Sequence, residues 1–394
     1  MSIVLSERNV SKIYCVALLI LPVLFEYTTG IATITVGDAF LMLCFFLMLL
    51  VTKNRNNRIK VHLSLLILYV FIQAVCILAI QGMSRTIMTA MRYLFYLACI
   101  YKLTDVCLER EWIFKRYEMI CIIGTVLEYI QTFMIRAFGV AVPGVIRAFP
   151  LTDPSMYNYS ALLYGSGNRC FSFFGEPSHY AIYMLPCVLI YLLDGNLNKK
   201  KAIKLLFVIL GILMSSAFTG MLGLVASFGL WIIKLFKKRV ISARTLGFVL
   251  GLGIVGLIVV STTGIGSYLR RSDMLSSASS GRFSGYNFIF TKYNPTTTQI
   301  LFGNGMHDLV ELDVYLPGWP RMYFYYGLIG SIIYVKAFSK CRNRNSLSSA
   351  LLLLLCVMAV GTEVNFNPFI LVYMALICSY ENNELLGQFL CDRK

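Results

Sequence analysis

Long apolar runs separated by short polar stretches dominate the sequence. Twelve of these runs approach the ~20 mostly apolar residues that a membrane-spanning helix needs. They predict spans at 13–29, 37–51, 62–80, 86–101, 119–135, 172–193, 204–218, 220–235, 246–262, 322–338, 347–361 and 367–380. The pattern therefore predicts an all-α polytopic membrane protein with about 12 transmembrane helices.

The composition agrees with this interpretation. Of the 394 residues, 58% are hydrophobic and 14% are charged. Soluble domains have roughly 45–50% apolar and 25% charged residues. A disordered chain, a disulfide scaffold and a secreted protein are excluded on these grounds.

The basic residues predict how the chain crosses the membrane. With the N-terminus inside, 25 of the 35 Lys and Arg residues fall in alternate connections, four each in 52–61 and 102–116. These connections hold 9 of the 19 acidic residues, so they account for the whole net charge of +16. The pattern obeys the positive-inside rule, places both termini in the cytoplasm, and explains the charge without a nucleic-acid partner.

Two predicted outer connections, about 136–171 and about 263–321, are much longer than the others. Loops of this length in a compact bundle are more often functional than idle. We expect a single integral-membrane domain, 1–394, that carries both loops on its outer side. Cys170 is the only cysteine predicted outside, so no disulfide is expected there, and the 12 cysteines show no metal-ligand spacing.

The first group of candidate chemical residues lies at the end of the first long loop. Pro177 predicts the first turn of a helix, where its missing N–H would be unpaired anyway. Glu176 then stands at the helix start, with His179 on roughly the same face and Arg169 just upstream. The group suits anion binding and proton transfer. The alternative is that Glu176 only complements the helix dipole and His179 is an interfacial polar residue.

Arginines form the second group, because Lys is nearly absent from the two long loops. The guanidinium offers a planar fork of donors, which suits a diphosphate better than the point charge of Lys. The arginines predicted to hold a diphosphate are Arg147, Arg169, Arg282 and Arg321. Loop solvation and salt bridges to nearby acids are the alternative.

Arg92 lies within the predicted span 86–101. An intramembrane charge is costly enough to be a functional candidate, so Arg92 joins the predicted diphosphate ligands. The alternative is a buried structural pair, with Glu128 on the next helix as its partner.

The exit of the second long loop contains Gly303-Asn-Gly305. This pair predicts a turn and not a nucleotide loop, because the Lys-Ser/Thr of a phosphate loop is missing. His307 nearby is a weaker candidate. Aromatic residues around both loops could stack on sugar rings, but they fit an interfacial aromatic belt equally well.

Four short motifs lie in or beside these loops. They are SFFGEPSHYAIY (172–183) after Arg169, SSAFTGMLGL (215–224), SGR (280–282), and GNG (303–305) leading to GLIG (327–330). Together with the span pattern, they resemble the Wzy-type O-antigen and exopolysaccharide polymerases, whose superfamily also contains the O-antigen ligases.

This resemblance implies a GT-C-like bundle in a bacterial inner membrane that works on undecaprenyl-diphosphate-linked oligosaccharides. Such enzymes transfer the growing chain to the non-reducing end of a new unit and release undecaprenyl diphosphate, without a metal or other cofactor. Loop arginines hold the diphosphates, which matches the four loop arginines above. Glu176, or as second choice His179, would be the base. A flippase and a chain-length-regulating co-polymerase are the implied partners.

Two alternatives stay open. A ligase would carry His and a polar residue before the last glycines, but alignment on Gly327 and Gly330 places Leu316 and Pro317 there. A twelve-span transporter or flippase would have two related halves around a midplane site, and the sequence shows no internal repeat.

Overall fold

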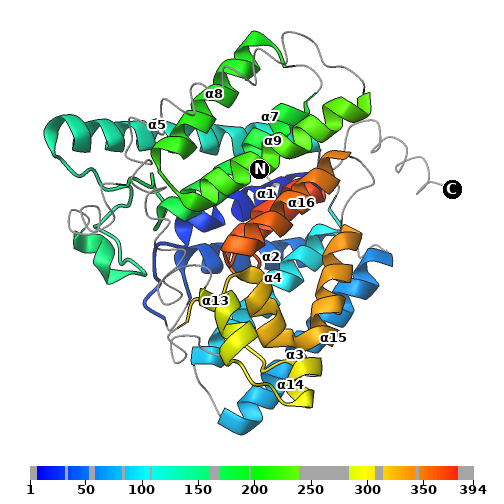
Figure 1. Ribbon diagram of the computed structural model, residues 1–394. Coiled ribbons are helices and arrows are strands. Elements are labelled where there is room, and N and C mark those ends of the chain that lie inside the picture. The colour runs from blue at the N-terminus through cyan, green and yellow to red at the C-terminus, as the bar shows by residue number, and fades with distance from the viewer. Residues whose placement is uncertain are drawn as a thin grey trace, which may run out of the picture. The chain divides into compact units, whose positions relative to one another are not determined.

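The fold is built from helices throughout the part of the chain that the structure describes (Figure 1). The computed structural model describes residues 7–31, 34–52, 58–81, 85–106, 109–158, 169–194, 197–238, 284–306, 314–341 and 346–379. These residues form 13 α-helices, one 3₁₀ turn and one π turn, without a sheet. They group into two compact units: unit 1 is Met1–Arg116 with Arg282–Lys394, and unit 2 is Tyr117–Gly281.

Among the described residues, three helices are both long and apolar enough to cross a membrane. They are α3 (Arg58–Gln81), α5 (Arg110–Phe138) and α9 (Phe218–Lys238). Only 28%, 39% and 33% of their most apolar windows are buried inside the protein. Because so much apolar surface faces outward, these helices indicate a membrane protein.

Most predicted spans coincide with helices, but the boundaries differ. Eleven of the 12 overlap an α-helix, and the span 246–262 lies outside the described residues. The span predicted to begin at 172 starts later, at Pro177, because the residues before it do not form helix. The second long loop is partly helical, since 284–306 contains three short helical elements. The number of transmembrane helices and the GT-C-like arrangement stay predictions.

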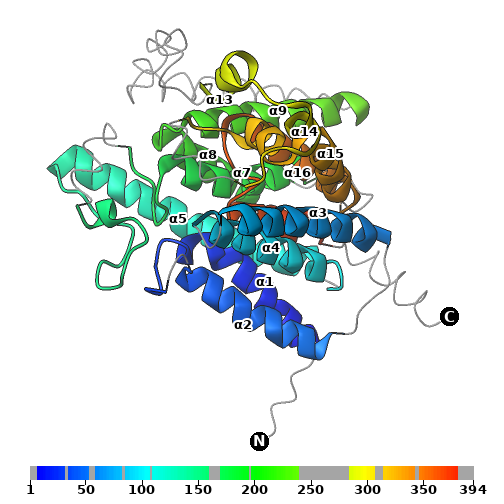
Figure 2. The same ribbon diagram turned by 90° about the horizontal axis from the view of Figure 1, so that it is seen from below.

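Unit 1 is organised around a short buried helix, α17. The unit comprises α1 (Glu7–Leu24), α2 (Val36–Val51), α3, α4 (Arg85–Leu103), the start of α5, α13 (Ser284–Asn287), the π turn η2 (Phe288–Lys292), α14 (Thr297–Phe302), α15 (Gly318–Cys341), α16 (Ser346–Gly361) and α17 (Phe369–Ile377). All residues of α17 are buried, as expected for a helix that is apolar all round. It packs against α1, α4 and α16, while α1 lies beside α2 (Figure 2) and α15 packs on α3 and α14.

Unit 2 has a similar centre in α7 (Pro177–Leu193), which is buried along almost its whole length. It packs on α8 (Lys199–Met214) and on α9 (Figure 1). Glycines permit the close approach of α9: a Cβ on Gly220 would lie 3.0 Å from Ala181 Cβ, and one on Gly223 would lie 2.1 Å from a Leu185 methyl. The glycines of the TGMLGL segment therefore serve helix packing.

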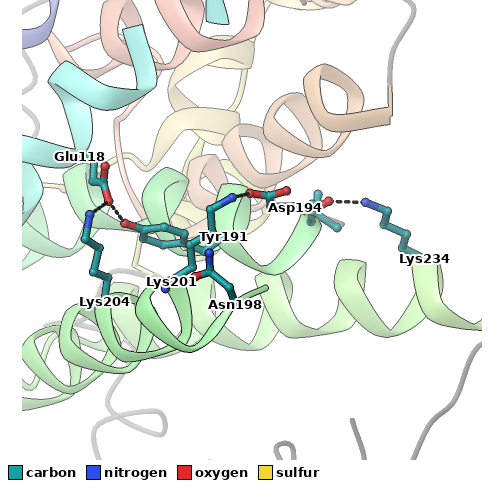
Figure 3. A network of polar contacts seen from close by, with 8 residues as sticks. Glu118, Tyr191, Asp194, Asn198, Lys201, Lys204 and Lys234 are labelled. Carbon is teal, nitrogen blue, oxygen red and sulfur yellow. Dashed lines mark hydrogen bonds and ion pairs between the residues drawn. The ribbon is translucent and has the colours of Figure 1, made fainter. Parts of the chain in front are cut away.

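The ends of the unit 2 helices are joined by polar contacts (Figure 3). Lys204 on α8 donates to Glu118 Oε1 on α5 at 2.6 Å, and the Tyr191 hydroxyl of α7 donates to the same oxygen. Lys201 forms an ion pair with Asp194 at the end of α7. The whole network comprises Glu118, Tyr191, Leu193, Asp194, Asn198, Lys201, Lys204 and Lys234. Each lysine side chain in it therefore has an acceptor.

Candidate functional site

The start of α7 holds two of the predicted site residues. Glu176 is the N-cap residue, with φ −145° and ψ 153°, and Pro177 occupies the first turn, which confirms the predicted helix start. Ser178 Oγ donates a hydrogen bond to Glu176 Oε2 at 2.7 Å. Glu176 is exposed and His179, in the same first turn, is half-buried. An accessible carboxylate therefore stands at the positive end of a helix.

Ser172, just before this helix, has a strained backbone with φ 57°. Its N–H donates to Gln131 Oε1 at 2.8 Å and to Glu128 Oε2 at 3.1 Å, and its Oγ donates to Gly124 O at 2.7 Å. Gln131 Nε2 returns bonds to Ser172 O at 3.0 Å and to Val142 O at 3.1 Å. The partners on α5 thus fix a conformation that would otherwise relax, a form of strain often found at functional sites. We call this arrangement the Ser172 clamp.

The Ser172 clamp also brings two arginine-bearing segments together. Gly144 packs so closely on the Ser172 carbonyl that a Cβ there would lie 1.6 Å from its oxygen. The loop with Arg147 is therefore fixed against the segment that runs from Arg169 into α7. Arg147 is exposed and Arg169 is half-buried. These two predicted ligands share unit 2 with Glu176.

Cys170, beside the clamp, is a buried thiol that is 1% exposed. Its pKa rises to about 12, mainly because of burial and in smaller part because of the nearby Glu128. The predicted outer cysteine is therefore held in its protonated form.

Arg321 lies in the first turn of α15 in unit 1, where it is already paired. Its guanidinium forms an ion pair with Glu363 Oε2, and its Nε donates to Leu316 O at 3.0 Å. The Arg321 side chain is 14% exposed. A diphosphate at Arg321 would have to compete with the Glu363 carboxylate.

Arg92 forms an ion pair with Asp38 in unit 1, as the alternative of a structural pair predicts, but the partner named for that pair, Glu128, is wrong. Arg92 Nε lies 3.2 Å from Asp38 Oδ2, and the Tyr96 hydroxyl donates to Asp38 Oδ1 at 2.8 Å. Thr35 also binds the Asp38 carboxylate, because its N–H and hydroxyl both donate to Asp38 Oδ2 in the capping box of α2. The buried Asp38 carboxylate lies on α2, within reach of Arg92 on α4. Glu128 instead accepts a hydrogen bond from Ser172 N–H in the Ser172 clamp.

Two sequence candidates lie outside the described residues. They are Arg282, predicted to hold a diphosphate, and His307, the weaker candidate.

The contact between the GNG and GLIG motifs was not predicted. Gly303, the C-cap residue of α14, has φ 78° and Gly305 has φ 75°, while Gly327 has φ 61° within α15, which breaks that helix. A Cβ on Gly303 would lie 2.6 Å from Gly327 N, and one on Gly327 would lie 2.5 Å from Gly303 N. The two motifs therefore meet backbone to backbone.

The break in α15 leaves carbonyl groups that need new partners. Asn304 N and Gly305 N donate to the carbonyls of Phe324 and Tyr325, both at 2.9 Å. Two polar side chains of α3 supply further donors. They lie four residues apart on an otherwise apolar helix, and this spacing was the signal by which the sequence could have identified them. Tyr69 OH lies 2.8 Å from both Phe302 O and Tyr326 O, and Gln73 Nε2 donates to Phe302 O at 2.7 Å and to Tyr325 O at 3.1 Å.

No group of three or more His, Cys, Asp or Glu side chains suited to a metal ion occurs among the described residues. No model of a known protein family matches the chain, and no curated protein matches it either.

Proposed function

We propose that this chain polymerises undecaprenyl-diphosphate-linked oligosaccharides at the outer face of a bacterial inner membrane. The growing glycan is transferred from its lipid carrier to the non-reducing end of a new repeat unit. Glu176, Arg147 and Arg169 form the centre of the site, and the neighbouring His179 is the second candidate for the base.

The reaction needs few chemical groups. An acceptor hydroxyl attacks the anomeric carbon, the bond from that carbon to the diphosphate oxygen breaks, and undecaprenyl diphosphate leaves. Glu176 accepts the hydroxyl proton. Arg147 and Arg169 neutralise the charge that develops on the departing diphosphate. Direct displacement would invert the anomeric centre.

One observation supports this proposal most. The Ser172 clamp joins three sequence segments so that an exposed carboxylate, a helix N-terminus and two arginine-bearing segments belong to one fixed region. A strained residue four positions before an accessible acid is more typical of a reactive site than of a passive loop.

The test is polymerisation by the purified protein, reconstituted with undecaprenyl-diphosphate-linked repeat units. Arg147→Gln and Arg169→Gln should each lower kcat/KM by about 100-fold, as expected for loss of one charge-stabilising donor. Glu176→Gln should lower kcat by about 100-fold or more. Arg136→Gln is the matched control, since Arg136 is an exposed arginine of the same unit without a proposed role. Wild-type rates in all three site variants would overturn the proposal.

A deletion strain distinguishes the proposed polymerase from the alternative functions. If the glycan is an O-antigen, loss of the polymerase should leave lipid A-core with a single repeat unit. Complete absence of repeat units would indicate the ligase or a flippase instead. Unchanged long chains would refute a role in polymerisation.

A further inference from the structure

An open groove runs between α2, α3 and α4 of unit 1. Its volume is about 840 Å³, within the range of roughly 300–1,000 Å³ that is usual for ligand sites. Apolar side chains line most of it, including Phe45 from α2, Leu68 from α3 and Ala98 from α4. Leu68 is 53% exposed, so the groove opens to the outside of the unit.

The groove has one apolar end and one polar end. Phe71 and Met91 lie at the first, whereas Thr52, Tyr101 and Lys102 lie at the second. Met91 and Lys102 are separated along α4 by roughly 16 Å at 1.5 Å per residue. That length is about half of a ~30 Å hydrocarbon core, which is the depth of one leaflet. The groove therefore matches the acyl chain of a lipid from a single leaflet.

The polar end carries excess positive charge in a buried cluster. Lys60 and Lys102 both pair with Asp105, and their side chains are 8% and 6% exposed. Lys102 also donates to Thr52 O at 3.4 Å, and the Lys60 ammonium lies 5.0 Å from the centre of the Tyr101 ring. Two ammonium groups and one carboxylate leave a net charge of +1 beside the groove.

The sequence places this polar end at the cytoplasmic face. Thr52 and Lys102 are the first residues of the connections 52–61 and 102–116. Each connection holds four basic residues and is predicted to lie inside. Anionic headgroups of the inner leaflet attract such residues.

We infer that this groove binds one anionic glycerophospholipid of the inner leaflet. An acyl chain lies along Leu68 and Ala98, and the headgroup phosphate lies near Lys102. The site is independent of the proposed polymerase chemistry, because none of the residues assigned to that chemistry lines it.

Native mass spectrometry of the full chain in detergent tests this inference, with phosphatidylglycerol and phosphatidylcholine as probes. The wild type should retain one phosphatidylglycerol after delipidation. Leu68→Trp fills the groove and should weaken that binding at least tenfold. Leu65→Trp is the matched control, because Leu65 is 48% exposed on the same helix but does not line the groove. Equal retention by both variants, or equal loss from both, would refute a defined site.

The headgroup is tested separately. Lys102→Gln leaves Lys60 paired with Asp105, so the buried charges stay balanced and the variant should fold. It should lower the affinity for phosphatidylglycerol roughly fivefold and leave that for phosphatidylcholine unchanged. If the wild type binds the two lipids equally, the site does not recognise an anionic headgroup. A Lys102→Gln variant that keeps the preference would also refute the role of the cluster.

Discussion

Ser172 in unit 2 and Gly327 in unit 1 hold nearly the same unusual backbone angle by different means. Ser172 has φ 57° and Gly327 has φ 61°. Ser172 carries a Cβ, so hydrogen bonds from α5 must hold it in place. Gly327 has none, and backbone atoms crowd the position where a Cβ would lie, with Gly303 N at 2.5 Å and Leu301 O at 2.6 Å. The serine is held by its partners, whereas the glycine is required by close packing.

The difference separates the region that we propose to be reactive from a region of close packing. A glycine at positive φ stores little strain. The break in α15 therefore serves close backbone packing. A serine at positive φ stores strain of about 1–2 kcal/mol, which its surroundings must offset. The strained position lies beside the exposed Glu176, and this is why the chemistry is assigned to the start of α7.

The largest effect should come from adding a methyl group at the break in α15. Gly327→Ala forces a Cβ into backbone atoms, and we expect a loss of about 3–5 kcal/mol in the free energy of unfolding. Denaturant unfolding in micelles measures this loss. Gly139→Ala is the matched control, because Gly139 has φ 64° but no atom within 4 Å of its Cβ position. It should lose only about 1 kcal/mol, and similar losses in both variants would show that crowding is unimportant.

Removing a donor from the break should have the next largest effect. Gln73→Leu deletes the bonds to Phe302 O and Tyr325 O, and we expect a loss of about 1–3 kcal/mol in the free energy of unfolding. The same unfolding assay applies. A stability equal to that of the wild type would mean that these carbonyls do not depend on α3.

Two substitutions at Ser172 test its strain directly. Ser172→Ala loses the bond to Gly124 O but keeps the strained backbone, whereas Ser172→Gly loses the bond and relieves the strain. The alanine variant should therefore be less stable than the glycine variant by about 1 kcal/mol, as measured by the same denaturant unfolding. If the glycine variant were the less stable of the two, backbone strain at Ser172 would not affect the stability of this region.

An exposed contact of unit 2 should have the smallest effect. The Lys204 side chain is 48% exposed where it meets Glu118 (Figure 3). Lys204→Ala should therefore change the free energy of unfolding by less than about 1 kcal/mol. A loss as large as that from Gln73→Leu would mean that this exposed ion pair and the hydrogen bonds at the break in α15 contribute alike.

Local sequence signals predicted much of the fold. Apolar runs located 11 of the 13 described α-helices, and Pro177 marked the start of α7. These features depend on residues close together in the chain, which is the range over which periodicity and capping act.

Contacts between distant segments could not be predicted in the same way. Arg92 pairs with Asp38 because α2 and α4 meet in space, and no local pattern specifies that choice over Glu128. The Ser172 clamp joins α5 to a loop, and the break at Gly327 joins α15 to α14 and α3. The sequence supplied the candidate residues, but their partners depend on tertiary packing.

The burial of Cys170 has a consequence for resistance to oxidation. Only a thiolate attacks a disulfide or reacts readily with oxidants, and a pKa of about 12 leaves almost no thiolate near neutral pH. If the first long loop faces an oxidising compartment, as the charge pattern predicts, this thiol can remain reduced without a disulfide partner. Protection of the loop would then come from packing, with no need for a second cysteine.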